Sequence, residues 1–283
     1  MSKKVILITG ATTGIGRHTA IHLKTGGHKV IATGRNESAL AELQQSFGID
    51  TAALDVTCSE SIAAAKREVD RITEGRGIDV LVNNAGYGLL GPVEILSEED
   101  IRQQFETNVF GLLAVTRAFI PEMRARGAGR VINVSSIGGR MVFPLGGVYH
   151  ATKYAVEALS DALRMELRQF GIRVSVIEPG YIKTEFTSTT MSLVRKYAQA
   201  ESPYSRTLTA AAHMDPTTFE QFAVGPQPVA RAIEHASVAR WPRARYVAPF
   251  YNALGPILMG FLPRWLTDWV FRRMTGLHLP ANV

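Results

Sequence analysis

The stretch Val5-Ile6-Leu7-Ile8-Thr9-Gly10-Ala11-Thr12-Thr13-Gly14-Ile15-Gly16 decides the expected fold. Its first four residues form a short apolar run, typical of a strand that is buried on both faces. The glycine turn that follows lets backbone N–H groups approach a phosphate closely, and a helix from Arg17 adds the positive end of its dipole. This order predicts a dinucleotide site, with contacts expected from Gly10, Thr13, Gly14, Ile15 and Gly16.

Strand-like and helix-like segments alternate along the rest of the chain. Short β-branched runs occur at residues 30–32, 80–82, 131–134 and 174–177, and helical patterns occur at 38–47, 59–72, 98–124 and 149–170. The alternation predicts an α/β fold of the Rossmann type, a doubly wound parallel sheet with helices on both faces. Ligands of such a sheet bind at the carboxyl ends of its strands, so a functional motif is expected there.

Composition restricts the class of protein. The chain has 283 residues, a net charge of +6 and a hydrophobic content of 46%, which indicates a globular protein rather than a disordered one. Cys58 is the single cysteine, so neither an internal disulfide nor a cysteine metal cluster is expected. The apolar run after Lys4 is too short for a signal peptide, which favours the cytoplasm. The histidines show no metal-ligand spacing, so we expect them at the surface and expect no metal site.

The chain is expected to form one domain over residues 1–250, with a substrate lid at about 184–224, followed by an amphipathic extension at 251–283. From Arg240 onward there are six arginines against Asp268 alone, together with all three tryptophans. The extension is expected to cover the substrate pocket or a partner subunit, and contact with a membrane surface is the alternative. Nucleic acid binding is not expected, because the arginines lie in an apolar segment. Leucines on the helix at 149–170 suggest a homo-oligomer.

The end of the second strand indicates which dinucleotide is bound. An acidic residue there would accept hydrogen bonds from a ribose and repel a 2′-phosphate. This chain instead has Gly34 followed by Arg35, whose guanidinium suits a phosphate, so NADP(H) is favoured over NAD(H). Asp55, after the third strand, is expected to contact the adenine, and a helix N-cap is the other interpretation.

Tyr149 and Lys153 are four residues apart and share one face of the expected helix. A tyrosine pKa near 10 must fall to about 7 for proton transfer at neutral pH, and a nearby ammonium favours the phenolate. Ser136 follows a strand and is placed to hydrogen-bond a reacting oxygen, with Ser135 as the alternative. Asn84 and Gly86 end the fourth strand and are expected to meet the cofactor, while Asn108 is expected in the next helix as a buried polar group.

Over residues 4 to about 185, this set resembles the short-chain dehydrogenase/reductase family. The matching residues are Thr9, Gly10, Gly14, Gly16, Asp55, Asn83, Asn84, Gly86, Asn108, Ser136, Tyr149, Lys153, Pro179, Gly180 and Thr184. The resemblance implies that Lys153 holds the nicotinamide ribose and that Asn108 positions a proton-relaying water. It also implies that Pro179, Gly180 and Thr184 contact the cofactor, and it favours Ser136 over Ser135.

Residues 83–94 and 135–153 are similar to a branch with 17β-hydroxysteroid and retinol dehydrogenases and bacterial NADP-dependent aldehyde reductases. Leu90, Met141 and Phe143 flank Tyr149 and are expected to line the substrate pocket. The leading hypothesis is an NADPH-dependent reductase of an apolar aldehyde, ketone or hydroxysteroid-like substrate, reversible to alcohol oxidation, with Tyr149 as general acid and base. The alternatives are an NAD-dependent alcohol dehydrogenase and a non-catalytic NADP(H)-sensing protein.

Overall fold

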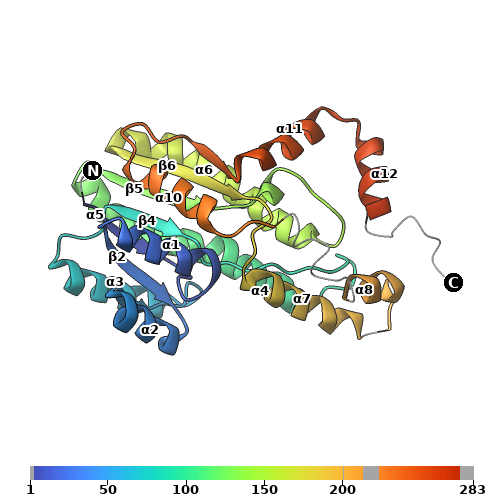
Figure 1. Cartoon of the computed structure of the whole chain (residues 1–283), viewed down its shortest axis with the longest axis horizontal. Helices are drawn as coiled ribbons and strands as arrows, with labels where there is room; N and C mark the ends of the chain where they lie inside the picture. The colour runs from blue at the N-terminus through green and yellow to red at the C-terminus, as the bar shows by residue number, and fades with distance from the viewer. Residues whose placement is uncertain (1–2, 200, 213–222, 275–283) are drawn as a thin grey trace.

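The computed structural model describes residues 3–199, 201–212 and 223–274. Within these residues, seven parallel strands form one sheet of order β3-β2-β1-β4-β5-β6-β7 (Figure 1). The strands are β1 Val5–Ile8, β2 Lys29–Gly34, β3 Asp50–Ala53, β4 Val80–Asn83, β5 Gly129–Val134, β6 Ile172–Pro179 and β7 Arg245–Ala248. The prediction of a doubly wound parallel sheet is therefore confirmed.

Helices connect the strands and cover both faces of the sheet. They are α1 Gly14–Thr25, α2 Glu37–Phe47, α3 Ser59–Thr73, α4 Glu98–Phe105, α5 Leu112–Ala125, α6 Gly147–Leu167, α7 Glu185–Ala198, α8 Ser205–Ala212, α10 Gln227–Val238, α11 Leu254–Phe261 and α12 Arg264–Met274. Because neighbouring side chains of a strand point to opposite faces, β1 contributes to two cores. Ile6 and Ile8 pack with α1 and α10, whereas Val5 and Leu7 pack with α3 and α5.

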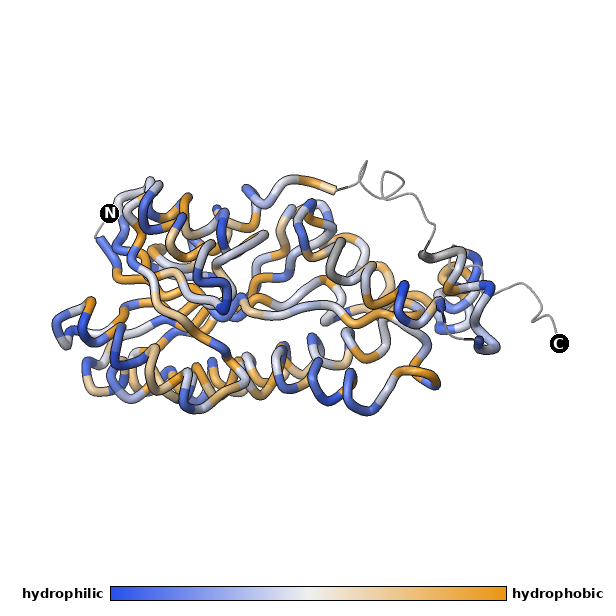
Figure 2. Tube along the Cα trace, turned by 90° about the horizontal axis from the view of Figure 1, so that it is seen from below, coloured by the Kyte–Doolittle hydropathy of each residue, from blue (hydrophilic) through white to orange (hydrophobic). Residues whose placement is uncertain are grey.

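The hydropathy along the chain follows this layering. In Figure 2 the strands are mainly hydrophobic, while the outer helices alternate between hydrophilic and hydrophobic residues. A third apolar cluster lies away from the sheet and joins α4, the start of α6 and the lid helices α7 and α8; Leu89, Val148 and Leu208 are among its members. The predicted lid thus begins as two helices, and its residues 213–222, including Phe219 and Phe222, lie outside the described residues.

Two predictions about elements need correction. The helix predicted at 98–124 is α4 and α5 with a π-helical turn, Glu106–Gly111, between them, because backbone hydrogen bonding widens by one residue there. Strand β7 was not predicted, and it places residues 245–248 at the edge of the sheet.

The C-terminal helices α11 and α12 extend away from the sheet in Figure 1. They follow β7 through a 3₁₀ turn, Phe250–Ala253, and the predicted extension continues past them into residues 275–283, which lie outside the described residues. In the described part of the chain, no helix combines the length and the apolar character needed to cross a bilayer.

Candidate active site

The predicted site residues gather at the carboxyl edge of the sheet, where β1 and β4 are neighbours. The chain leaves these two strands in opposite directions, so a crevice forms between the turns that follow them. The two turns meet closely: a Cβ on Gly10 would lie 2.8 Å from the Cα of Ala85, and Gly10 has a φ of +61°. Only glycine fits this position.

The start of α1 carries an anion-binding arrangement. Its N-cap, Thr13, makes no side-chain cap, and the N–H of Gly14 donates to the Glu185 carboxylate at 3.0 Å. Glu185 and its neighbour Thr184, the N-cap, begin α7, the first helix of the predicted lid, so this helix end meets the glycine turn. The carboxylate shows that the helix N-terminus accepts a negative group, as it would accept a dinucleotide phosphate. The contact joins residues 171 positions apart, and no sequence pattern signals it.

Asn84 and Gly16 maintain the shape of this turn. The Asn84 amide donates to the carbonyls of Thr9 and Gly10 at 3.0 Å, and a Cβ on Gly16 would lie 2.3 Å from the Gly10 oxygen. The predicted cofactor contact Ile15 packs partly against the apolar core. These three residues therefore support the glycine turn from the protein side.

Arg35 lies directly after β2 and is exposed at its side chain by 77%. Its Nη1 is 3.9 Å from Oδ2 of Asp55, so the two predicted adenosine-end residues lie together. Burial alone would raise the pKa of Asp55, but hydrogen bonds from Thr57 and the charge of Arg35 lower it. The N-cap interpretation of Asp55 is wrong, because Cys58 is the N-cap of the helix α3.

Ser136, Tyr149 and Lys153 lie together after β5. The Ser136 hydroxyl hydrogen-bonds Tyr149, and the Lys153 ammonium is 5.8 Å from the centre of the tyrosine ring. Lys153 Nζ also donates to the Val134 carbonyl at 3.0 Å, which holds it at the end of the strand. Ser135, the alternative to Ser136, instead faces the main chain of Lys153 and the carboxylate of Glu157.

Burial and the Ser136 hydroxyl determine the pKa of Tyr149 among the protein groups, and its lowering by Lys153 together with an oxidised cofactor stays a prediction. Burial raises the pKa of Tyr149 to about 12, and the Ser136 hydroxyl only partly offsets this. Burial also lowers the pKa of Lys153 to about 8, against the raising effect of Glu157. The surroundings therefore favour the neutral form of both groups, because each loses solvation as a charge.

A partly buried ionic cluster lies one helical turn beyond Lys153. Arg245 of β7 donates from Nε to Glu157 at 3.1 Å and from Nη2 to Asp161 at 2.5 Å, and it lies 3.4 Å from Glu178. Burial raises the pKa of both Glu157 and Glu178, whereas the arginine lowers it. The unpredicted strand β7 thus brings a cation beneath the helix that carries Tyr149 and Lys153.

Asn108 lies within the π-helical turn and is buried, as predicted. Its Nδ2 donates to the Tyr87 carbonyl at 3.0 Å and to Thr152 at 3.1 Å, and its Oδ1 accepts from the Tyr87 N–H. A Cβ on Gly86 would lie 2.9 Å from Asn108 Oδ1 and 3.8 Å from Lys153 Nζ. Asn108 therefore ties the loop after β4 to helix α6, close to Lys153.

The predicted cofactor residues at and after the end of β6 lie in two different places. Thr184 lies over the glycine turn as the N-cap of α7. Pro179 ends β6, and Gly180 packs so tightly against Asn252 that a Cβ would overlap its side chain. The loop after Pro179 is thereby attached to the segment that leads into α11.

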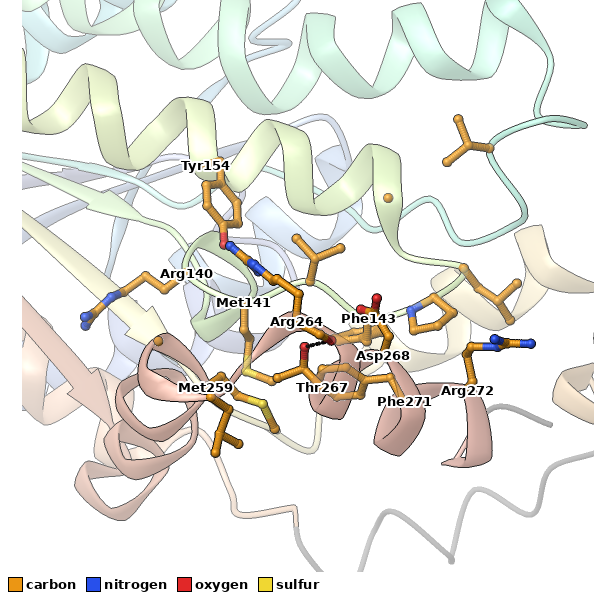
Figure 3. A pocket seen from close by; sticks show the side chains of 17 residues that line it. Arg140, Met141, Phe143, Tyr154, Met259, Arg264, Thr267, Asp268, Phe271 and Arg272 are labelled. Carbon is orange, nitrogen blue, oxygen red and sulfur yellow. Dashed lines mark hydrogen bonds between the residues drawn. The ribbon is translucent and has the colours of Figure 1, made fainter. Parts of the chain in front are cut away.

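The predicted substrate residues do not share one cavity. Met141 and Phe143 line a cavity of about 560 Å³, shown in Figure 3, whose opposite wall comes from α11 and α12. Leu90 instead packs against the third apolar cluster. Tyr149 is not among the lining residues, and its ring lies 5.8 Å from that of Phe186 in the lid. The extension therefore covers a cavity that Tyr149 does not line, and its covering of the substrate pocket stays a prediction.

The histidine prediction also needs correction. His28 and His150 are buried. His150 bonds through Nδ1 with the Gly138 carbonyl at 2.8 Å and packs edge-on against Phe143, and burial lowers its pKa. The sequence signal that could have indicated the burial of His150 is its position directly after Tyr149. In the described part of the chain, no three His, Cys, Asp or Glu side chains are arranged to hold a metal ion.

The sequence profile described as short chain dehydrogenase matches residues 4–193. The chain belongs to the short-chain dehydrogenase family. It is 35% identical over 270 residues to "Uncharacterized oxidoreductase YbbO" of Escherichia coli K12, covering 95% of this chain and 94% of that protein. It is 36% identical to "17-beta-hydroxysteroid dehydrogenase type 6" of Homo sapiens, covering 96% and 89%.

Two solved structures extend the likeness. A short-chain dehydrogenase from Streptomyces avermitilis has a TM-score of 0.74 and 32% identity, covering 98% of this chain and 99% of that one. The closed form of serine dehydrogenase complexed with NADP+ has a TM-score of 0.71 and 32% identity, covering 86% and 93%. This short-chain dehydrogenase is therefore an oxidoreductase whose family acts on alcohols and ketones, and its crevice, glycine turn and anion-accepting helix end fit a dinucleotide.

Proposed function

We propose that this short-chain dehydrogenase is an NADP(H)-dependent carbonyl reductase, reversible to alcohol oxidation, that acts on an apolar aldehyde, ketone or hydroxysteroid-like substrate. The observation that carries the proposal is the contact of Ser136 with Tyr149, beside Lys153, at the carboxyl edge of the sheet. This arrangement offers a hydroxyl proton donor, a second hydrogen-bond donor and a cation within one crevice. Those are the groups needed to protonate a carbonyl oxygen.

Two observations support NADP(H) over NAD(H). Arg35 presents an exposed guanidinium after β2, where an acidic residue would repel a 2′-phosphate. The related serine dehydrogenase is a complex with NADP+. Gly10, Gly14 and Thr184 would hold the rest of the cofactor.

The bound nicotinamide would supply the hydride for the carbonyl carbon. Tyr149 would give its hydroxyl proton to the carbonyl oxygen, while Ser136 donates a hydrogen bond to the same oxygen. The neighbouring Lys153 ammonium would favour the phenolate that forms, and together with the cofactor's positive charge it would offset the burial that raises the pKa of Tyr149. Asn108 would hold the loop and the helix so that protons can reach Lys153.

The apolar surroundings support a lipophilic substrate. The Phe186 ring faces Tyr149, and Met141 and Phe143 line the adjoining cavity. A pocket of this kind binds ligands mainly through apolar area and uses few polar groups for orientation. The relatives named for hydroxysteroids carry out chemistry on substrates of that class.

The test is consumption of NADPH and of NADH by the purified protein with a panel of lipophilic aldehydes and ketones. We expect turnover with NADPH, and we expect Tyr149→Phe to lower it by about 10²- to 10⁴-fold while NADPH still binds. Ser136→Ala should lower turnover far more than its neighbour Ser135→Ala, which removes the same hydroxyl one position away. Equal losses in the two serine variants, or full activity of Tyr149→Phe, would contradict the proposal. Binding of NADPH without turnover of any carbonyl would favour the sensor alternative.

A further inference from the structure

The C-terminal helices expose several large apolar side chains. Leu254, Leu258 and Phe261 recur at helical spacing on α11 and are all exposed, Phe261 by 85%. Trp265 and Trp269 are one turn apart on α12 and are exposed by 70% and 54%. With two residues of the preceding 3₁₀ turn they form what we call the outer surface: Phe250, Tyr251, Leu254, Leu258, Phe261, Trp265 and Trp269. Soluble monomers rarely keep so many large apolar groups in water without a partner.

The opposite sides of the same helices hold them in place. Met259 of α11 and Thr267 and Phe271 of α12 line the cavity that faces the loop before α6 (Figure 3). Thr267 is buried, and its hydroxyl donates to the Arg264 carbonyl at 2.8 Å. The three apolar clusters of the body contain no residue of the outer surface, as far as the described chain shows. The outer surface is therefore not needed to hold the helices against the protein.

Charge indicates what kind of partner covers the outer surface. Between residues 254 and 274 there are three arginines, Arg264, Arg272 and Arg273, against one acidic residue, Asp268. Arg273 is the one of these four that is not among the residues lining the cavity. The Arg273 guanidinium lies 5.2 Å from the centre of the Trp269 ring. Exposed tryptophans with adjacent cations are typical of helices that lie in the headgroup region of a membrane.

We propose that the outer surface docks on the surface of an anionic lipid bilayer, with Phe261, Trp265 and Trp269 inserted at headgroup depth and Arg273 at the phosphates. A second copy of the chain is a poorer partner. A symmetric dimer would place the same patch against itself, and the outer surface has no carboxylate that could pair with the Arg273 beside it. Anionic lipids instead complement that charge.

The place of the outer surface in the fold brings it near the catalytic edge of the sheet. Strand β7 is parallel to β6, so its carboxyl end at Ala248 lies at the same edge of the sheet as Ser136. The helices that follow β7 therefore start from the catalytic edge. Docking through them places the cavity lined by Met141 and Phe143 directly behind the docked helices.

The chain contains a matched control for the tryptophans. Trp241 is also exposed, by 72%, and stacks on Arg173 with 4.8 Å between the guanidinium carbon and the ring centre. It precedes β7 and so lies at the opposite edge of the sheet. Substitution of Trp241 removes an exposed tryptophan beside arginines without touching the outer surface.

The experiment is flotation of the full chain with phosphatidylcholine vesicles, with and without phosphatidylglycerol. We expect binding to the anionic vesicles, and the combined Phe261→Ser, Trp265→Ser and Trp269→Ser variant should lower the partition coefficient by about 100-fold or more. Trp241→Ala should leave it unchanged. Arg273→Gln should lower binding to anionic vesicles by about 5-fold and leave binding to neutral vesicles unchanged.

Fluorescence gives a second measure of vesicle binding that does not depend on flotation. In a Trp241→Phe background, only Trp265 and Trp269 emit, and their emission should shift to the blue on addition of anionic vesicles. Circular dichroism of the serine variant should match that of the parent chain, which separates lost docking from misfolding. An unchanged partition coefficient in the serine variant, an equal loss in Trp241→Ala, or a dimer that the serine variant abolishes without any vesicle binding would each overturn the proposal.

Discussion

Large apolar side chains are buried in the sheet of this molecule but exposed on its last two helices, α11 and α12. In the sheet, Ile6 and Leu7 are buried against helices on opposite faces, and each has its partners within the chain. In α11 and α12, Phe261 and Trp265 point away from the protein. The difference shows that the sheet supplies the stability of the fold, whereas the last two helices carry apolar area that stability does not require.

The largest expected effect comes from comparing the two parts directly. Ile6→Ala should lower the free energy of unfolding by about 2–5 kcal/mol, because it leaves a cavity in a closely packed core. Phe261→Ala should change it by no more than about 0.5 kcal/mol, because the ring is already in water. Urea unfolding of the two variants measures both values. A loss above about 2 kcal/mol in Phe261→Ala would contradict the division between body and outer surface.

A smaller effect concerns cofactor choice within the body. Arg35→Ala should weaken NADPH binding by about 10- to 100-fold, because charge-assisted hydrogen bonds to the 2′-phosphate are lost. NADH binding should stay unchanged. Fluorescence titration of both nucleotides measures this, and Arg67→Ala, which removes an exposed arginine of α3, is the control. Equal weakening for the two nucleotides would show that Arg35 does not select between them.

The contact between lid and body predicts a still smaller change. Glu185→Gln should tighten NADPH binding by about 3- to 10-fold, because the carboxylate that accepts from the Gly14 N–H competes with a phosphate for the same helix end. Glu166→Gln, an exposed position on α6, should have no effect. Weaker binding in Glu185→Gln would mean that the carboxylate helps to form the site rather than competing for it.

The smallest predicted effect is a shift of the pH profile. Tyr149, with a pKa of about 12, keeps its proton over the working range, whereas Lys153 loses its charge as the pH rises through about 8. The value of kcat/KM for carbonyl reduction should therefore be level below about pH 8 and fall above it. Glu157→Gln should move this break to lower pH, because the glutamate raises the pKa of Lys153. A break that stays in place would exclude Glu157 as a positioning residue.

Local pattern was sufficient for much of the fold. The strand at residues 5–8 has the predicted bounds, and β2, β4, β5 and β6 contain the predicted runs, because continuous β-branched residues are typical of strands covered on both faces. Strand β7 could not be predicted in this way. It begins with Arg245, whose charge is compensated by Glu157 and Asp161 more than 80 positions earlier, and local sequence does not report such a pairing.

The candidate site, like the fold, could be predicted from local sequence only in part. The four-residue spacing of Tyr149 and Lys153 predicts their common face, and their place after a strand predicts the edge at which they lie. The pKa values could not be predicted from spacing, because they depend on burial from all sides. The contact of Glu185 with Gly14 depends on how the lid folds back over the sheet, which is a property of tertiary structure.

The π-helical turn at Glu106–Gly111 has a consequence for how this region tolerates change. Deletion of one residue there would restore regular helical winding and shift Asn108 from its place in the widened turn. Asn108 would then lose Tyr87, and the loop after β4 would be released although no functional group had been altered. In this segment, chain length by itself is a determinant of activity, and an altered residue count would do more harm than most replacements of one side chain by another.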